Sequence, residues 1–362
     1  MIFFVAPREE TFTMDDYLRR EEGLEMAKSI RTLAYEDLFA RPELPVGSYV
    51  FAALDQLTPT GNEIVARFRR ALADVVPGIV LLNDPGTVLH RYELLERASA
   101  TGRNSFHVTR AFTLAARPRF PVFLRPEREH TGSLTGLIAT PRQLQRELLA
   151  ASVRGYRLRD LLVVEYCDTA DSAGIFRKYS AYIVGDRVIP RSINQSRHWV
   201  TKDHDRIIDD HTAQEELEYV TTNPHAAWLT DSFRLAGAQY GRVDYGLLNG
   251  TPQLWEVNLC PTVGRRLGPA FPSTRTDAQR ALLAPARRHF YQRFQAALED
   301  LDRPDDSRIV TVSIATSEMK RLLTEQRKLA RVRSRNTIIS AVLHPVARLL
   351  KRVASRQRLP GN

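Results

Sequence analysis

The segment from Tyr240 to Gly264, YGRVDYGLLNGTPQLWEVNLCPTVG, constrains the fold more than any other part of the chain. Apolar and polar residues alternate on either side of the dipeptide Asn249-Gly250. Since successive side chains of a strand point to opposite faces, this alternation predicts a β-hairpin with one apolar and one polar face. The apolar face is expected to hold Val243, Tyr245, Leu247, Trp255, Val257 and Leu259, and the polar face Arg242, Asp244, Gly246, Glu256, Asn258 and Cys260.

The register of this hairpin follows from keeping the apolar residues of both strands on one side. That condition pairs Asp244 with Glu256 and Arg242 with Asn258. A two-residue turn at Asn249-Gly250 would shift the pairing by one residue and separate the carboxylates, although Asn-Gly is the usual signal for such a turn. We therefore expect a wider loop of about three or five residues.

Two facing carboxylates destabilise a sheet unless a cation lies between them. Mg²⁺ prefers hard oxygen ligands and commonly takes one or two carboxylates, with phosphate and water oxygens completing its coordination. The hairpin therefore predicts a site for Mg²⁺, or Mn²⁺ in its place, at Asp244, Glu256 and Asn258. A solvated hairpin with charged outer residues is the alternative for this spacing taken alone.

Length and composition indicate a globular chain of two or three packed subdomains, with 362 residues, of which 43% are hydrophobic and 26% charged. No apolar run approaches the roughly 20 residues that span a bilayer. The two cysteines, Cys167 and Cys260, fit neither a disulfide framework nor zinc spacing. A cytoplasmic location is the resulting expectation.

The N-terminal part predicts strands that alternate with helices. Strands are expected at 2–6, 48–55 and 78–84, a helix-rich segment at 15–39, and an amphipathic helix at 62–75. Such alternation favours a parallel, Rossmann-like sheet. The glycines of this region do not form a dinucleotide-binding fingerprint.

The middle of the chain predicts a helix that carries Arg91 and ends near residue 101, followed by strands at 106–111 and 120–126, the second of which carries Arg125. A glycine-containing loop at 127–136 and a helix at 141–154 lead to a buried strand in LLVVEYCDT, 161–169. A second hairpin at 176–193, turned at Gly185-Asp186, presents Arg177, Lys178 and Arg191 as candidate phosphate or substrate contacts.

The order of these segments resembles that of the ATP-grasp superfamily over about 48–266. The landmarks are NDPGTVLHRYELLERA, FPVFLRP with its glycine loop, LLVVEYCDT, the hairpin ending in PRSI, GRVDYGLL and LWEVNLCPTVG. The resemblance implies an α/β (α+β) chain with a Rossmann-like domain at 1–85, an ATP-grasp domain at 86–304 and a basic helical extension at 305–362. Two subdomains of the ATP-grasp domain would clamp ATP, the smaller, at about 105–165, forming its lid.

The resemblance also implies roles for individual residues. Asp244, Glu256 and Asn258 would hold one or two Mg²⁺ ions. Arg191 would neutralise the transferred phosphoryl group or an acylphosphate, with Lys178 as a second catalytic candidate. Residues expected to bind ATP are Arg91 and Arg125, where the family usually has lysines, Thr131, Gly132, Ser133 and Gly136 in the loop over the phosphates, and Glu165, Tyr166 and Cys167 against the adenine.

The implied function is an ATP- and Mg²⁺-dependent ligase. It would activate a small-molecule or peptide carboxylate as an acylphosphate, which an amine or another nucleophile attacks with release of ADP and phosphate. A small-molecule kinase on the same fold is one alternative. The other is a non-catalytic nucleotide-binding protein with a regulatory or assembly role.

The net charge of +10 is concentrated at the C-terminus, where Lys320 to Arg358 contains twelve Lys and Arg and the single acid Glu325. That segment carries +11, which leaves −1 for the rest of the chain. Apolar residues recur at helical spacing between Ile339 and Val353. A basic amphipathic helix of this kind is expected to dock on an acidic protein or on an anionic membrane surface, and an inert solvated extension is the alternative. Nucleic acid is disfavoured because the tail has no aromatic residues for base stacking.

Overall fold

The computed structural model describes residues 1–113, 118–128, 132–201, 205–264, 275–304 and 306–329, which form two compact units. The first unit comprises 1–107 and 167–319, and the second comprises 108–166 with the residues from 320 onward. Both parallel and antiparallel sheets are present beside helices, which confirms the mixed α/β class expected from the sequence. Each unit is described by itself.

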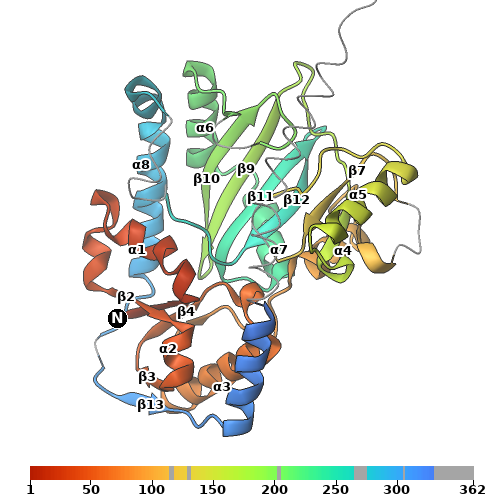
Figure 1. Ribbon diagram of the computed structural model, residues 1–362. Coiled ribbons are helices and arrows are strands. Elements are labelled where there is room, and N and C mark those ends of the chain that lie inside the picture. The colour runs from red at the N-terminus through yellow and green to blue at the C-terminus, as the bar shows by residue number, and fades with distance from the viewer. Residues whose placement is uncertain (114–117, 129–131, 202–204, 265–274, 305, 330–362) are drawn as a thin grey trace, which may run out of the picture. The chain divides into compact units, whose positions relative to one another are not determined.

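A parallel sheet opens the first unit, with strand order β2-β1-β4-β5. Figure 1 labels β2 and β4 of this sheet. Its strands are β1 Ile2–Ala6, β2 Ile30–Ala34, β4 Ser48–Phe51 and β5 Leu81–Leu82. Strand β2 lies inside the segment expected to be rich in helix, so that expectation was wrong there. Only its two terminal residues are buried, and a five-residue strand without alternation gives no period-two pattern to recognise.

The second sheet of this unit is antiparallel, with order β10-β9-β11-β12 (Figure 1). Its strands are β9 Phe176–Val184, β10 Arg187–Ser196, β11 Tyr240–Leu248 and β12 Thr251–Asn258. Val184 pairs with Arg187 across Gly185-Asp186, which confirms the predicted turn of the β9–β10 hairpin. Helices α6 Asp210–Thr222, α7 Ala226–Ala236 and α8 Asp277–Glu299 pack against this sheet.

Helix starts are encoded locally by capping residues. The Asp209 carboxylate accepts a hydrogen bond from Thr212 N at the start of α6, and the Thr276 hydroxyl accepts one from Gln279 N at the start of α8. Each pair forms a reciprocal capping box. These caps fix the residue at which each of the two helices begins.

The side chain of Asn83 joins the parallel sheet of the first unit to its four-stranded antiparallel sheet. Its amide donates to Phe51 O (3.1 Å) and Tyr240 O (2.9 Å), and its carbonyl oxygen accepts from Gln239 N (2.9 Å) and Tyr240 N (3.0 Å). The residue is fully buried, and a buried amide with all these bonds made specifies one geometry. Asn83 therefore fixes where β11 begins.

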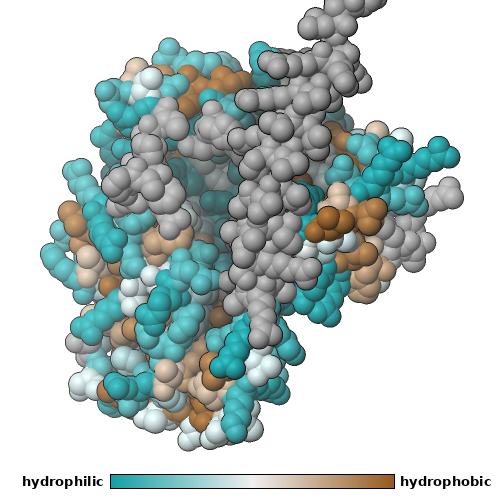
Figure 2. All heavy atoms as spheres, in the orientation of Figure 1, coloured by the Kyte–Doolittle hydropathy of each residue, from teal (hydrophilic) through white to brown (hydrophobic). Residues whose placement is uncertain are grey.

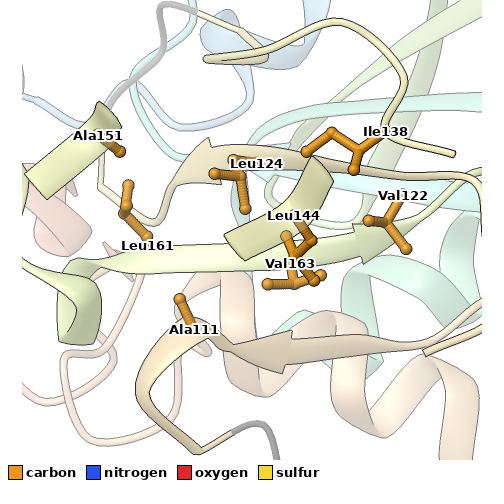
Figure 3. Packing of buried hydrophobic residues seen from close by; sticks show 8 residues of the cluster. All are labelled: Ala111, Val122, Leu124, Ile138, Leu144, Ala151, Leu161 and Val163. Atoms are coloured by element: carbon orange, nitrogen blue, oxygen red, sulfur yellow. The ribbon is translucent and has the colours of Figure 1, made fainter. Parts of the chain in front are cut away.

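In the second unit, β6 Val108–Arg110, β7 Val122–Pro126 and β8 Leu161–Glu165 form an antiparallel sheet covered by α5 Pro141–Val153. Figure 3 shows the hydrophobic core between the sheet and the helix. The labelled members of this core are Ala111, Val122, Leu124, Ile138, Leu144, Ala151, Leu161 and Val163.

The remaining elements complete the two units. They are α1 Phe12–Leu18, α2 Tyr35–Ala40, α3 Pro59–Val75, α4 Arg91–Ala100, the strand pair β3 Glu43–Pro45 and β13 Ile309–Thr311, a helix at 316–329, and the 3-10 helices η1 Arg8–Glu10, η2 Glu21–Gly23, η3 Glu25–Lys28, η4 Leu54–Gln56, η5 Ala111–Thr113 and η6 Leu158–Asp160. Hydrophilic residues cover most of the coloured surface in Figure 2. Among the helices described, none is long and apolar enough to cross a membrane. The amphipathic segment expected between Ile339 and Val353 lies outside the described residues.

Candidate active site on the antiparallel sheet

The β11–β12 hairpin has the predicted register where its polar residues lie. Asp244 faces Glu256, and Arg242 faces Asn258. The two carboxylates therefore come from adjacent strands and share one face of the sheet, with Asn258 two residues further along β12. This part of the sequence-based prediction is confirmed.

The loop of the hairpin was predicted wrongly. Leu248 pairs with Thr251, so the connection is the two-residue turn Asn249-Gly250 that the dipeptide signals. Both residues have positive φ, 50° and 80°, as the favoured type I′ turn requires. A register shift between Asp244 and Tyr245 supplies the extra residue that the pairing needs, so a β-bulge takes the place of the wider loop.

The bulge falls at Trp255 and moves its side chain to the polar face. Leu254, which is fully buried, faces Tyr245 in the place expected for Trp255. The indole instead packs on Gly246, where an added Cβ would lie 2.4 Å from a ring atom. Because Gly246 follows Asp244 by two residues on β11, Trp255 is half-buried beside the carboxylates, with its ring on their face.

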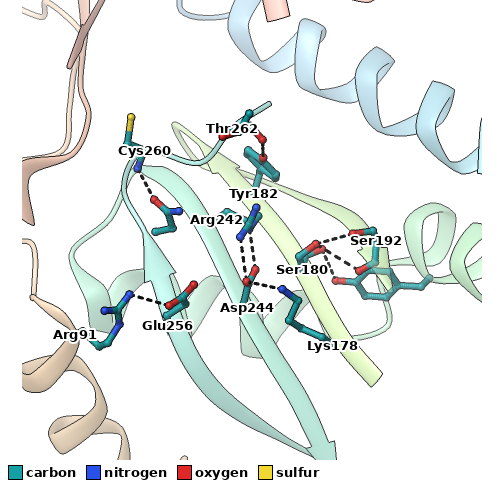
Figure 4. Close-up of polar contacts among 12 residues, drawn as sticks. Arg91, Lys178, Ser180, Tyr182, Ser192, Arg242, Asp244, Glu256, Cys260 and Thr262 are labelled. Carbon is teal, nitrogen blue, oxygen red and sulfur yellow. Dashed lines mark hydrogen bonds and ion pairs between the residues drawn. The ribbon is translucent and has the colours of Figure 1, made fainter. Parts of the chain in front are cut away.

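Basic side chains hold the Asp244 carboxylate, which is only 4% exposed. Arg242 donates to both of its oxygens, from Nε at 2.8 Å and Nη2 at 3.0 Å, and Lys178 Nζ on β9 lies 3.3 Å from Oδ2 (Figure 4). Burial alone would lower the pKa of Arg242, but Asp244, Tyr182 and Glu256 together outweigh it and the pKa is raised. Lys178 thus lies at the predicted metal site. Arg242 was placed on this face by alternation, but no role was predicted for it.

Glu256 is held by Arg91, whose Nη2 lies 2.8 Å from Oε2 (Figure 4). Arg91 is the first residue of α4, so a residue predicted to bind ATP contacts a predicted metal ligand. The Asn258 carbonyl oxygen accepts a hydrogen bond from Cys260 N at 2.8 Å. That bond orients the amide at the end of β12.

Two polar residues that the sequence did not point to tie other segments to β12. Asn104 pairs with the backbone of Leu254, donating to its oxygen at 2.8 Å and accepting from its nitrogen at 2.7 Å. The side-chain oxygen Oε1 of Gln253 accepts a hydrogen bond from Ser105 N at 2.8 Å, and Cys167 Sγ lies 4.0 Å from the same oxygen. Cys167, predicted to lie against the adenine, is therefore adjacent to the edge of β12.

The other residues predicted to bind ATP lie in the second unit. Arg125 is on the face of β7 opposite the buried Val122 and Leu124. The Glu165 carboxylate is 6% exposed and accepts a hydrogen bond from Arg119 N at 2.7 Å. Tyr166 N donates to Pro121 O at 2.9 Å. Gly132, Ser133 and Gly136 are in the loop after β7, and Thr131 lies outside the described residues.

Arg191 does not join the carboxylates. Its guanidinium lies 4.6 Å from the ring centre of Phe290 on α8. The structure therefore brings Lys178, but not Arg191, into contact with a predicted metal ligand.

The donor set on this face fits a magnesium ion that is shared with a nucleotide. Its oxygens come from two carboxylates and one amide, and Mg²⁺ commonly takes few protein ligands and completes its octahedron with phosphate and water. Within the described ranges, no group of three or more His, Cys, Asp and Glu side chains could hold a metal ion by itself. Asp244 and Glu256, with Asn258 beside them, are the residues that would hold it.

The chain matches no family model, and no curated protein matches it. The solved structures to which it is similar include a D-alanine–D-alanine ligase from Bacillus anthracis complexed with ATP, at 13% identity and TM-score 0.43, covering 83% of this chain and 99% of that chain. An L-amino acid ligase from Bacillus licheniformis matches at 11% identity and TM-score 0.44, covering 82% and 74%. A RimK domain protein ATP-grasp from Sphaerobacter thermophilus DSM 20745 matches at 14% identity and TM-score 0.37, covering 80% and 99%.

Proposed function

We propose that the protein is an ATP- and Mg²⁺-dependent ligase that activates a carboxylate as an acylphosphate for attack by an amine. The observation that carries the proposal is the direct pairing of Asp244 with Glu256 on adjacent strands, with Asn258 on the same face. Three basic groups, Arg242, Lys178 and Arg91, contact these carboxylates. Oxygen ligands for a metal and cations for phosphate are thus combined on one sheet face.

The chemistry of a carboxylate ligase needs these two kinds of group. An amine does not displace oxide from a carboxylate, whereas phosphorylation provides a good leaving group. Mg²⁺ bound at Asp244 and Glu256 would offset the charge of the nucleotide phosphates. Arg242 and Lys178 could exchange their carboxylate partner for phosphate oxygens, and a guanidinium binds such oxygens in a bidentate fork.

Two alternatives remain, and each makes a different prediction. A small-molecule kinase would leave the phosphate on the product instead of releasing it. A non-catalytic nucleotide-binding protein is favoured by one observation, the 2.8 Å ion pair in which Arg91 is held by Glu256. It would bind ATP and release no phosphate with any acceptor.

We also infer a cytoplasmic setting, in which the free thiols of Cys167 and Cys260 stay reduced. The basic tail would then face acidic proteins or the anionic inner surface of a membrane. Deletion of 330–362 should reduce the fraction of protein that co-sediments with vesicles rich in anionic phospholipid.

The first test is a calorimetric titration of ATP with and without Mg²⁺. The native protein is compared with Glu256→Gln and with Glu218→Gln, a matched substitution at an exposed position of α6. Mg²⁺-dependent binding that is weakened in Glu256→Gln and unchanged in Glu218→Gln supports the site. Carboxylates and amines are then screened for ADP and phosphate release. A folded native protein that binds no ATP refutes the proposal.

A further inference from the structure

A β-bulge interrupts the pairing of β10 with β9 at Arg191. Pro190 pairs with Ala181 and Ser192 with Ser180, so Arg191 is an extra residue without a partner on β9. The Arg191 guanidinium carbon lies 4.6 Å from the ring centre of Phe290 and 5.8 Å from that of Tyr291, both on α8.

No carboxylate is paired with Arg191 among the residues that the structure describes. It differs in this respect from Arg242, Lys178 and Arg91, which each contact Asp244 or Glu256. Arg191 is half-buried, and buried arginines are normally paired. Aromatic rings below its guanidinium leave the charge available to an anion.

This cation lies close to the proposed reaction site without taking part in its ion pairs. The Tyr182 ring lies 5.2 Å from that of Phe290, the ring below Arg191, and Tyr182 pairs with Arg242 across β9 and β11. The Tyr182 hydroxyl donates to Thr262 O at 2.9 Å (Figure 4). The chain after β12 also passes close to α8, since an added Cβ at Gly264 would lie 2.4 Å from the Tyr291 hydroxyl oxygen.

Building on the ligase function above, we propose that Arg191 binds a second carboxylate of a substrate, one that is not phosphorylated. A single guanidinium matches the single charge of a carboxylate and its two oxygens. A phosphate dianion would leave unmatched charge against the aromatic rings of α8, which is costly. The carboxylate would belong to a dicarboxylic acid that is activated at its other end, or to an amino acid that acts as the amine. Arg191 is then a specificity-determining residue.

The test uses protein saturated with a non-hydrolysable ATP analogue and Mg²⁺, titrated with two panels of compounds. One panel pairs short dicarboxylates with their monoamides, and the other pairs amino acids with their C-terminal amides. We expect native protein to prefer the free carboxylate in one panel, and Arg191→Gln to weaken that compound roughly 10- to 100-fold. Arg191→Lys should recover part of the affinity. Arg187→Gln, on the same strand and ion-paired with Asp300, should bind like the native protein.

The outcomes separate this inference from the ligase function. A preference in the dicarboxylate panel assigns the site to the acid, and a preference in the amino acid panel assigns it to the acceptor. If ATP binds but native protein prefers the carboxylate in neither panel, or Arg191→Gln keeps the preference, the inference is wrong while the nucleotide function stands. ATP affinity is measured in every variant, so a fall in ATP affinity for Arg191→Gln would indicate a phosphate contact and also overturn the inference.

Discussion

Substitution of Asp244 by Asn should destabilise the fold as well as the proposed site. The carboxylate is 4% exposed and neutralises two cations, Arg242 and Lys178. Relief of repulsion with Glu256 works in the opposite direction, but Arg91 already compensates that group at 2.8 Å. The surplus of positive charge therefore decides the sign, and Asp244→Asn should lower the free energy of unfolding.

The magnitude follows from the contacts of the carboxylate. Removing one partner of a buried ion pair costs about 3–5 kcal/mol. The side chains of Arg242 and Lys178 are 24% and 25% exposed, so water recovers part of that cost, and the remaining Asn oxygen can accept one hydrogen bond. We expect a loss of about 2–3 kcal/mol.

Urea unfolding at low salt measures this loss. The transition is monitored by both far-ultraviolet circular dichroism and tryptophan fluorescence, because the two compact units need not unfold together. Asp231→Asn is the control, since that side chain is 45% exposed although it too pairs with two cations, Arg234 and Arg103. Its effect should stay within about 0.5 kcal/mol. In Lys178→Met protein, Asp244→Asn should cost less, because one cation is already absent. An Asp244→Asn protein as stable as the native one would refute the reasoning and show that repulsion between the carboxylates dominates.

Three further outcomes are expected. Gly250→Ala should cost about 1 kcal/mol in urea unfolding, because φ is +80° and an added Cβ meets nothing, whereas Gly136→Ala, without positive φ, should be close to neutral. Burial lowers the pKa of His225 from 6.5, so the stability that the neutral ring provides is present above pH 6.5 and is lost as the pH falls from 6.5 toward the folded-state pKa. The free energy of unfolding should therefore be lower at about pH 5 than at about pH 8, and this decrease should be smaller in His225→Gln. Mg²⁺ alone should shift the melting temperature by less than about 1 °C, since basic side chains already compensate both carboxylates, while saturating ATP with Mg²⁺ should raise it by about 5 °C or more.

Local sequence patterns predicted much of the fold. Alternation identified both hairpins, and the Gly185-Asp186 turn was placed correctly. The five-residue strand β2 was missed because its burial does not alternate. Asn83 could not be recognised either, since its partners Gln239 and Tyr240 lie more than 150 residues away and no local period encodes a contact of that range.

The candidate site was predictable to the extent that its residues share one hairpin. Asp244 and Glu256 were paired correctly because the period-two alternation of side chains on two strands fixes which residues share a face. The face on which Arg242 lies was predictable from the same alternation, since Arg242 precedes Asp244 by two residues. The ion pair between Arg91 and Glu256 spans 165 residues, and only the packing of α4 beside β12 produces it.

Side chains alternate between the two faces only along uninterrupted stretches of strand, and two bulges interrupt this alternation in the sheet. On β12 the bulge reconciles the Asn249-Gly250 turn with the pairing of the carboxylates, and it brings Trp255 to their face. On β10 the bulge releases Arg191 from the ladder and places it over Phe290. The bulge on β12 adds to this face a side chain that alternation assigns to the apolar face. Alternation from the Gly185-Asp186 turn would instead pair Arg191 with Ser180, which faces Asp244. Trp255 is therefore the side chain of this face that strand periodicity predicts least well, whereas the two carboxylates lie where the alternation still holds.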